Sequence, residues 1–133
     1  MSNEPRAPRL AVLIDADNAS SRIATRLFEE IAKIVHEAGA LLLVDAVTSL
    51  GGVPVEVDKW GIDAIYSGTQ KCLSCPPGLA PVSFNQRAMD VIMARKTKVQ
   101  SWYLDVTMLA NYWGSDRVYH HTAPINMSYG LYE

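Results

Sequence analysis

The first third of the chain contains two short apolar runs separated by a segment with helical spacing. Residues 9–15 (RLAVLID) and 41–47 (LLLVDAV) are the two runs, and each contains an aspartate. Apolar runs of this length are typical of strands buried on both faces of a parallel sheet. Between them, apolar residues recur every three or four positions up to Ala38, which predicts a helix that ends at Gly39. The pattern predicts a β-α-β unit with a right-handed crossover, preceded by a disordered tail at residues 1–8.

The rest of the sequence alternates between loop, strand and helix signals. In chain order the predicted elements are a loop at 51–54, a strand at 62–67, a loop at 68–80, a strand at 81–84, and helices at 86–96, 103–113 and 126–133. We therefore expect one three-layer α/β domain over residues 9–133. Its sheet should be small and mostly parallel, with about four strands in the order 1-2-3-4 and flanking helices.

Composition and charge exclude several classes of function. Hydrophobic residues make up 49% of the chain and charged residues 20%, which is typical of a globular protein, and the net charge is −2. A nearly neutral chain has no field that attracts nucleic acid or an anionic membrane, so we expect neither as a partner. We find no leader-like segment and no stretch near the roughly 20 apolar residues of a membrane span. We therefore expect a cytoplasmic location or a recombinant expression product.

Two cysteines, Cys72 and Cys75, lie in the second predicted loop and are too few for a disulfide framework. Their spacing is that of a redox motif, but prolines follow them where such a motif opens a helix. We interpret them as ordinary loop cysteines. A zinc site would need two further ligands, and the adjacent His120 and His121 lie far along the chain.

The strongest chemical signal is Lys71, which ends the polar segment SGTQK directly after a predicted strand. Lysine amines form Schiff bases with carbonyl compounds, although an exposed lysine in a polar turn is an equally good interpretation of Lys71 alone. Asp45 ends the preceding predicted strand. Ligands of open parallel sheets bind at the carboxyl edge, where both residues would lie. Pyridoxal-phosphate enzymes combine such a lysine with an acid that keeps the pyridine nitrogen protonated.

The motifs around these two residues resemble pyridoxal-phosphate aminotransferases of the alanine–glyoxylate and serine–pyruvate type. The resemblance covers about residues 35–133. It rests on LLLVDAVTSLGG at 41–52, GIDAIYSGTQK at 61–71, PPG at 76–78 and YHHT at 119–122. In the fold that this resemblance implies, the last strand of the sheet is antiparallel.

The resemblance also implies a role for each matching residue near the cofactor. Lys71 matches the lysine that holds the cofactor as a Schiff base, and Asp45 matches the acid that pairs with the pyridine nitrogen. Val47 matches the apolar residue that packs on one face of the ring. Gln70 matches a neighbour in the pocket of the phosphate and the ring oxygen.

Tyr119 and Thr122 match residues that, in this family, reach the cofactor phosphate of the other subunit of a dimer. The predicted sheet would also have unpaired edge strands, which invite pairing with another chain. We therefore expect a homodimer or a swapped self-association.

The family's phosphate-binding glycine pair, ring-stacking aromatic residue, serine near the ring oxygen and substrate-binding arginine have no counterpart in this sequence. The chain is therefore expected to be shorter than the whole enzyme. A site without these groups should bind pyridoxal phosphate weakly or not at all.

Residues 9–34 show a second, different resemblance. LAVLIDADNAS at 10–20 and LFEEIAKI at 27–34 are similar to the opening of a NYN-type, PIN-like nuclease domain. There Asp15 would match the first metal-binding acid, although one carboxylate rarely holds Mg²⁺. The two resemblances meet near residues 34 and 35, within one helix whose apolar spacing continues across the junction.

The sequence therefore supports three functional hypotheses. The main hypothesis is a recombined or designed chimera of two families that has no physiological catalytic activity. The alternative is residual pyridoxal-phosphate binding through Lys71, with weak aminotransferase chemistry. A metal-dependent nuclease that uses Asp15 is the remote alternative.

Overall fold

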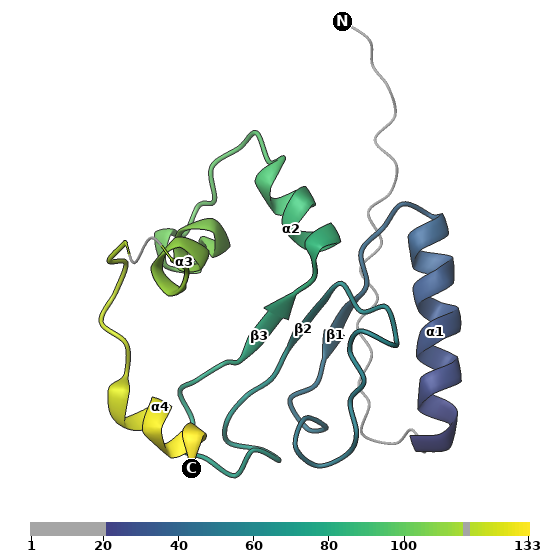
Figure 1. Cartoon of the computed structure of the whole chain (residues 1–133), viewed down its shortest axis with the longest axis horizontal. Helices are drawn as coiled ribbons and strands as arrows, with labels where there is room; N and C mark the ends of the chain where they lie inside the picture. Colours follow the sequence, from purple (N-terminus) through teal and green to yellow (C-terminus); the bar gives the residue numbers. More distant parts are fainter. Residues whose placement is uncertain (1–20, 116–117) are drawn as a thin grey trace, which may run out of the picture.

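The computed structural model describes residues 21–115 and 118–133 (Figure 1). In chain order its elements are α1 (Ser21–Glu37), β1 (Leu43–Asp45), β2 (Ala64–Tyr66), β3 (Val82–Phe84), α2 (Gln86–Met93), the 3₁₀ helix η1 (Trp102–Leu104), α3 (Val106–Trp113) and α4 (Ile125–Tyr132). The predicted tail and the predicted strand at 9–15, including Asp15, lie outside the described residues. No helix in the described part of the chain is long and apolar enough to cross a membrane.

The three strands form one mixed sheet in the order β1-β2-β3. Strand β1 pairs with β2 in parallel, and the register places Asp45 opposite Tyr66. Strand β3 pairs with β2 in the antiparallel direction, as the family resemblance implied for the last strand. The predicted order is therefore found for these three strands, while the first strand of the predicted four falls on residues that are not described. The carboxyl ends of β1 and β2 share one edge of the sheet, where the loops that follow them begin (Figure 1).

Helix α1 packs beside the sheet (Figure 1) through one stripe of its surface. The buried residues of this stripe recur every three or four positions, as expected for the inner face of an amphipathic helix: Ala24, Phe28, Ala32 and Val35. Ile23, Leu27 and Ile34 also belong to the predicted apolar spacing, but they are exposed. The inner face is therefore narrower than the sequence pattern predicted.

The predicted helix end at Gly39 is present in the structure. Gly39 has φ 72°, a conformation that glycine adopts without steric cost. Its amide donates to the carbonyl of His36 at 2.9 Å, and the amide of Ala40 donates to the carbonyl of Val35 at 3.0 Å. This pair of bonds is the Schellman arrangement, which satisfies the last carbonyls of a helix.

The long loop between β1 and β2 packs on α1 through Trp60. The indole ring stacks on Phe28 with centroids 4.8 Å apart and planes inclined by 7°, and its Nε1 donates to Thr25 Oγ1 at 3.1 Å. Burying an aromatic side chain of this size contributes about 2–3 kcal/mol. Of the three tryptophans, Trp60 is thus a core residue, whereas Trp102 and Trp113 are exposed.

Asp63 lies just before β2 and joins three parts of the fold. Its side chain is buried, and Oδ2 accepts hydrogen bonds from the amide of Leu42 at 2.7 Å and from Arg87 at 3.3 Å. The His36 ring nitrogen Nε2 lies 2.8 Å from the same oxygen. Asn85, the residue that caps α2, donates to Oδ1 at 3.0 Å. One carboxylate therefore links the end of α1, the start of β1 and the start of α2.

The environment of Asp63 holds its pKa below the ordinary value of 3.8. Burial alone acts in the opposite direction and raises the pKa, since it penalises the charged form. Hydrogen bonds from Leu42, Asn85 and His36, together with the charge of His36, outweigh burial because they favour the ionised carboxylate. The buried acid is therefore ionised at neutral pH and depends on its donors.

Two predicted helices differ from the observed ones by more than one residue. The helix predicted at 103–113 is divided, because Asp105 Oδ1 accepts a hydrogen bond from the amide of Thr107 at 3.0 Å and so caps α3. The residues before this cap form η1. Helix α2 ends at Met93, three residues before the predicted end. There the amide of Arg95 donates a hydrogen bond to the carbonyl of Ile92 at 3.3 Å.

We expect Asp63→Asn to lower the free energy of unfolding by about 3 kcal/mol at pH 7, because the neutral side chain leaves Arg87 without a counter-ion and weakens the hydrogen bonds that converge on this buried position. Urea denaturation measures this difference. A lowered folded-state pKa means that the contribution of Asp63 is present above about pH 3.8 and is lost as the pH falls through the folded-state pKa. The free energies of unfolding of the wild type and of Asp63→Asn should therefore become equal at acidic pH. The exposed Asp58 provides the control variant Asp58→Asn, and equal losses in both variants would contradict the prediction.

Candidate cofactor-binding site

Asp45 and Tyr66 end neighbouring parallel strands, and their side chains meet at the carboxyl edge of the sheet. The Tyr66 hydroxyl donates to Asp45 Oδ2 at 2.7 Å. The other carboxylate oxygen, Oδ1, accepts the amide of Val47 at 2.9 Å. Asp45 is half-buried, so two donors orient its carboxylate without enclosing it.

The same hydrogen bond changes the acidity of Tyr66. Donation to the carboxylate of Asp45 raises the pKa of the Tyr66 phenol above its usual value of 10.0, and burial and the negative charge of Asp45 raise it further. The phenol therefore keeps its proton at neutral pH and remains a donor to Asp45.

Lys71 is exposed on the loop between β2 and β3, residues 67–81, which we call the lysine loop. Backbone hydrogen bonds join distant parts of this loop to each other. The amide of Thr69 donates to the carbonyl of Leu79 at 3.2 Å, and the amide of Cys75 donates to the carbonyl of Thr69 at 2.8 Å. Thr69 is fully buried, and its hydroxyl donates to the carbonyl of Pro76 at 2.6 Å. These bonds hold the loop on both sides of the lysine.

The start of this loop is tied to the residue that follows β1. The Ser67 hydroxyl donates to the carbonyl of Ala46 at 3.1 Å, and the amide of Ala46 donates to the carbonyl of Tyr66 at 2.9 Å. Gln70 is exposed, and its amide group lies against Gly68, where an added Cβ would come within 2.9 Å of Gln70 Oε1. The lysine loop therefore leaves the sheet beside the chain segment that contains Asp45.

Cys72 joins the lysine loop to the loop after β1. Its thiol donates to the carbonyl of Thr48 at 2.9 Å, and a Cβ added to Gly52 would lie 2.8 Å from the sulfur. The absence of a side chain at Gly52 thus permits this close approach. Both Cys72 and Cys75 are free thiols, in agreement with their interpretation as loop cysteines.

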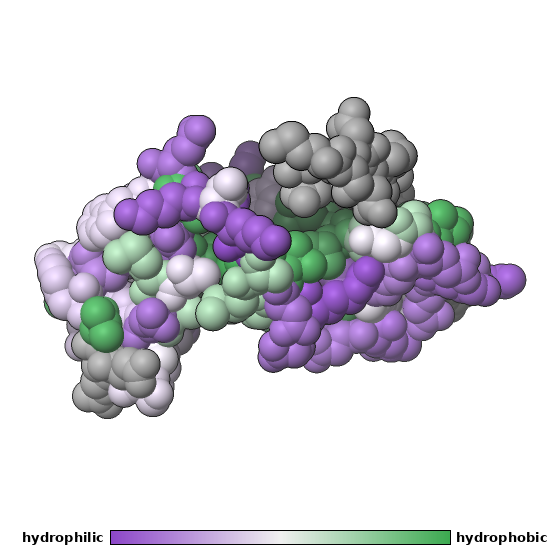
Figure 2. Space-filling model, turned by 90° about the horizontal axis from the view of Figure 1, so that it is seen from above, coloured by the Kyte–Doolittle hydropathy of each residue, from purple (hydrophilic) through white to green (hydrophobic). Residues whose placement is uncertain are grey.

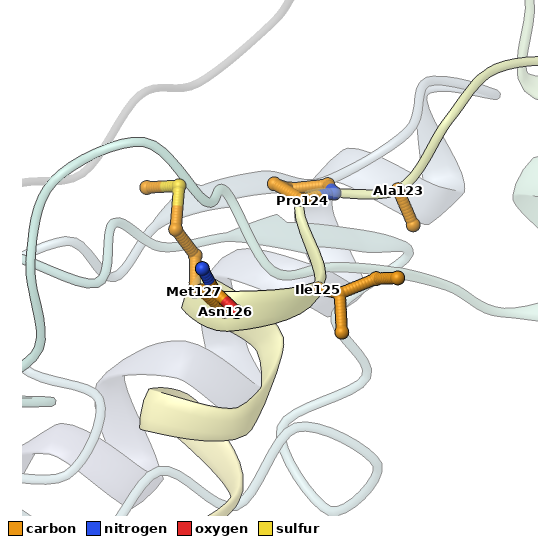
Figure 3. A pocket seen from close by; sticks show the side chains of 5 residues that line it. All are labelled: Ala123, Pro124, Ile125, Asn126 and Met127. Carbon is orange, nitrogen blue, oxygen red and sulfur yellow. The ribbon is translucent and has the colours of Figure 1, made fainter.

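Helix α4 packs against the far side of the lysine loop. The Cys75 thiol donates to the carbonyl of Gly130 in α4 at 3.2 Å, and Met127 would clash with a side chain added to Gly78. Figure 3 shows the first turn of α4, where Met127 and Ile125 project from different sides of the helix and line a pocket. The lining residues are Ala123, Pro124, Ile125, Asn126 and Met127, so none of the predicted cofactor-binding residues lines this pocket.

Tyr119 and Thr122 lie in the segment between α3 and α4, away from the strand end that contains Asp45 (Figure 1). Their hydroxyl groups are 2.9 Å apart, and Tyr119 is 72% exposed. Between them, His120 is buried and stacks on Trp102 with ring centroids 4.1 Å apart. The structure therefore brings Asp45, Val47, Gln70 and Lys71 to one edge of the sheet but places this predicted pair elsewhere.

Clusters of metal-ligating side chains are absent from the part of the chain that the structure describes. Across residues 21–115 and 118–133, no three His, Cys, Asp or Glu side chains form a group that could hold a metal ion. Asp15, the acid suggested by the nuclease resemblance, is not among these residues.

The groups at this edge of the sheet fit pyridoxal phosphate in their chemistry. A lysine amine can condense with the cofactor's aldehyde, and a carboxylate can pair with its protonated ring nitrogen. Lys71 is exposed on a closed loop, and the carboxylate of Asp45 is oriented by two donors. Each carboxylate oxygen accepts one described hydrogen bond and has capacity for another.

Solved structures place this chain among aminotransferases. The alanine–glyoxylate aminotransferase of Nostoc sp. superposes with a TM-score of 0.76 and 54% sequence identity. The match covers 78% of this chain and 28% of that one. The small α/β fold with its mixed sheet is therefore part of an aminotransferase fold.

The family follows from the sequence comparison. The model for aminotransferase class-V matches residues 10–133, so the chain belongs to the class-V aminotransferase family. Rabbit alanine–glyoxylate aminotransferase is 50% identical over 104 residues, which are 76% of this chain and 26% of that protein. (S)-ureidoglycine–glyoxylate transaminase of Bacillus subtilis is 36% identical over 144 aligned residues, covering 95% of this chain and 34% of the relative. The chain thus spans about a quarter to a third of the length of these relatives.

These matches give no support to the chimera hypothesis or to a nuclease segment. The family match begins at residue 10 and runs through the expected junction near residues 34 and 35. The alignment with the B. subtilis protein, which includes 95% of this chain, also crosses that junction. A single family accounts for the whole matched range, and the findings favour the aminotransferase alternative over the main hypothesis.

Sequence reasoning missed Tyr66, which was part of a quoted motif but received no role. The sequence did contain a signal for this role. Asp45 lies at the end of one predicted strand, and Tyr66 lies near the end of the next. Parallel pairing of the two predicted strands in register would have placed the phenol beside the acid. The contacts of Cys72 and Met127 with glycines of other loops had no comparable signal, since no local pattern predicts them.

We expect Gly78→Ala to lower the free energy of unfolding by about 2 kcal/mol, because Gly78 has φ 131° and an added methyl group would displace Met127 of α4. Chemical denaturation measures the change. Gly130→Ala is the matched control, since a Cβ there meets nothing within 4 Å. Alanine inside α4 should stabilise the chain by up to about 1 kcal/mol. Equal effects at both positions would show that α4 does not pack on the lysine loop.

Proposed function

We propose that this chain carries the lysine and the acid of a pyridoxal-phosphate-dependent aminotransferase site, and that the cofactor binds covalently to Lys71. The observation that carries this proposal is that Asp45, at the end of β1, and Lys71, on the loop after β2, lie at one edge of the sheet, with the Asp45 carboxylate oriented by Tyr66 and Val47. Membership of the class-V aminotransferase family supports the same cofactor.

Each residue at this edge would have a distinct task. Bound pyridoxal phosphate supplies an electron sink for the carbon that exchanges its amino group. Lys71 would hold the aldehyde carbon and later accept or donate protons there. Asp45 would keep the ring nitrogen protonated. Val47, half-buried beside Asp45, would pack on the ring, and Gln70 would bind the ring oxygen or phosphate.

The proposed reaction class is amino transfer with a small 2-oxo acid as acceptor. The names of the rabbit and B. subtilis relatives both include glyoxylate, which supports glyoxylate as the acceptor. Because the chain spans about a quarter to a third of these proteins, we expect turnover by this chain to be slow. Glycine formed from pyridoxamine phosphate and glyoxylate, measured by mass spectrometry, tests the reaction class.

Trapping with borohydride tests the covalent attachment. We expect incubation with pyridoxal phosphate followed by reduction to leave one cofactor on the peptide that contains Lys71, because the loop that carries Lys71 leaves the sheet beside Asp45. Peptide mass spectrometry locates the product. Lys71→Ala should abolish it, whereas Lys59→Ala, at an exposed lysine paired with Glu56, should leave it unchanged. Labelling spread over Lys33, Lys59, Lys96 and Lys98 would contradict the proposal.

Asp45→Asn should weaken cofactor binding at least tenfold, roughly the effect of removing one partner of a buried charge pair. The amide oxygen of asparagine can still accept the Val47 amide, and its NH2 group can donate to the Tyr66 oxygen, so both contacts can persist while the charge is removed. Absorbance titration with pyridoxal phosphate measures the dissociation constant. Unchanged affinity would mean that Asp45 does not pair with the ring nitrogen.

We also propose that the chain associates with a second copy through the surface of η1, α3 and the segment before α4. This surface exposes large apolar side chains, among them Trp102, Leu104, Trp113 and Tyr119. Hydrophilic side chains dominate the surface at the opposite end, near α1 (Figure 2). An exposed apolar patch of this kind is typical of an interface.

Sedimentation velocity tests the association. Trp113→Glu should shift the chain from dimer to monomer, because a carboxylate in an apolar interface is not solvated. Ile34→Glu is the matched control, since Ile34 is equally exposed but lies on α1, at the other end of the molecule (Figure 1). A wild-type chain that sediments as a monomer at all concentrations would contradict the proposal.

A further inference from the structure

The Asp45 carboxylate is oriented by two donors of different kinds. The amide of Val47 binds Oδ1 and belongs to the same turn, only two residues along the chain. The hydroxyl of Tyr66 binds Oδ2 and comes from the neighbouring strand. A single donor would leave the carboxylate free to rotate about that bond, whereas donors on both oxygens determine its plane. Tyr66 is therefore the contact that fixes the carboxylate relative to the sheet.

The backbone that carries Tyr66 is rigid on both sides of the side chain. Tyr66 is paired with Asp45 on one side and with Val82 of β3 on the other. Its carbonyl also accepts the amide of Ala46 at 2.9 Å. Groups held on paired strands keep their geometry better than groups held on loops. The phenol is thus a fixed donor, and its raised pKa keeps it protonated at neutral pH.

Tyr66 is also the last residue of β2, and the lysine loop begins directly after it. Ser67 follows it directly and donates to the carbonyl of Ala46, the residue after Asp45. The phenol therefore fixes the acid from the same chain segment that leads to Lys71. A residue in this place can hold the two reactive side chains in a constant relative position.

We infer that Tyr66 is a positioning residue that aims the Asp45 carboxylate at the ring nitrogen of pyridoxal phosphate. This inference rests on the proposed function. Tyr66 does not touch the reacting atoms and acts through Asp45. Its hydrogen bond occupies one acceptor position of Oδ2 and leaves the remaining positions of the carboxylate for the ring N–H.

The test is a double-mutant cycle read by cofactor affinity. Tyr66→Phe removes only the hydroxyl, and we expect it to raise the dissociation constant of pyridoxal phosphate about fivefold, as for the loss of one hydrogen bond. In the Asp45→Asn background, where the charge that Tyr66 orients is gone, Tyr66→Phe should change the affinity less than twofold. A merely structural role would weaken binding equally in both backgrounds.

Two further measurements keep the outcomes distinct. Tyr132→Phe, at a tyrosine that is 86% exposed on α4, should leave the affinity unchanged. Borohydride trapping on Lys71 is run with every variant. A wild-type chain that traps no cofactor on Lys71 overturns the proposed function and this inference together. If the wild-type chain traps the cofactor on Lys71, two results overturn this inference alone. The first is that Tyr66→Phe binds pyridoxal phosphate as tightly as the wild type. The second is that Tyr66→Phe weakens binding by the same factor with Asp45 and with Asn at position 45.

Discussion

The parallel pairing of β1 with β2 decides which side chains meet at the candidate site. Its register places Asp45 beside Tyr66, and the bond from the amide of Ala46 to the carbonyl of Tyr66 extends the ladder one residue past the end of β1. A slip by one residue would turn the side chains of one strand to the other face. The acid would then lose the phenol, and the loop that carries Lys71 would start from a different point. The chemistry of this edge thus depends on three backbone pairs.

Much of this arrangement could be predicted because it follows from local patterns. The apolar spacing predicted α1, and Gly39 marked its end. The strand-end acid and the lysine after the next strand predicted a shared sheet edge. What could not be predicted depends on contacts between distant residues. The inner face of α1 is selected by Trp60, which stacks on Phe28 from a loop without helical or strand periodicity.

The expectation of a chimera has a physical explanation. A buried apolar strand followed by an amphipathic helix is a common unit of α/β folds, because any helix that covers a parallel sheet needs this pattern. The similarity of residues 9–34 to a nuclease domain was of this general kind. By contrast, the segments with Asp45 and Lys71 carry specific chemistry at fixed spacing. A short segment that matches only a folding pattern thus identifies an architecture and not a family.

Asp63 and Asp45 lie near opposite ends of the sheet, and the fold uses them differently. Asp45 is half-buried and has acceptor positions left, whereas Asp63 is buried and its two oxygens are shared among Leu42, His36, Arg87 and Asn85. A carboxylate shared in this way makes the end of α1, the start of β1 and the start of α2 a single cooperative unit. None of these segments can open locally without breaking a bond to the same acid. Their amides are thus expected to exchange hydrogen with solvent through a common opening event.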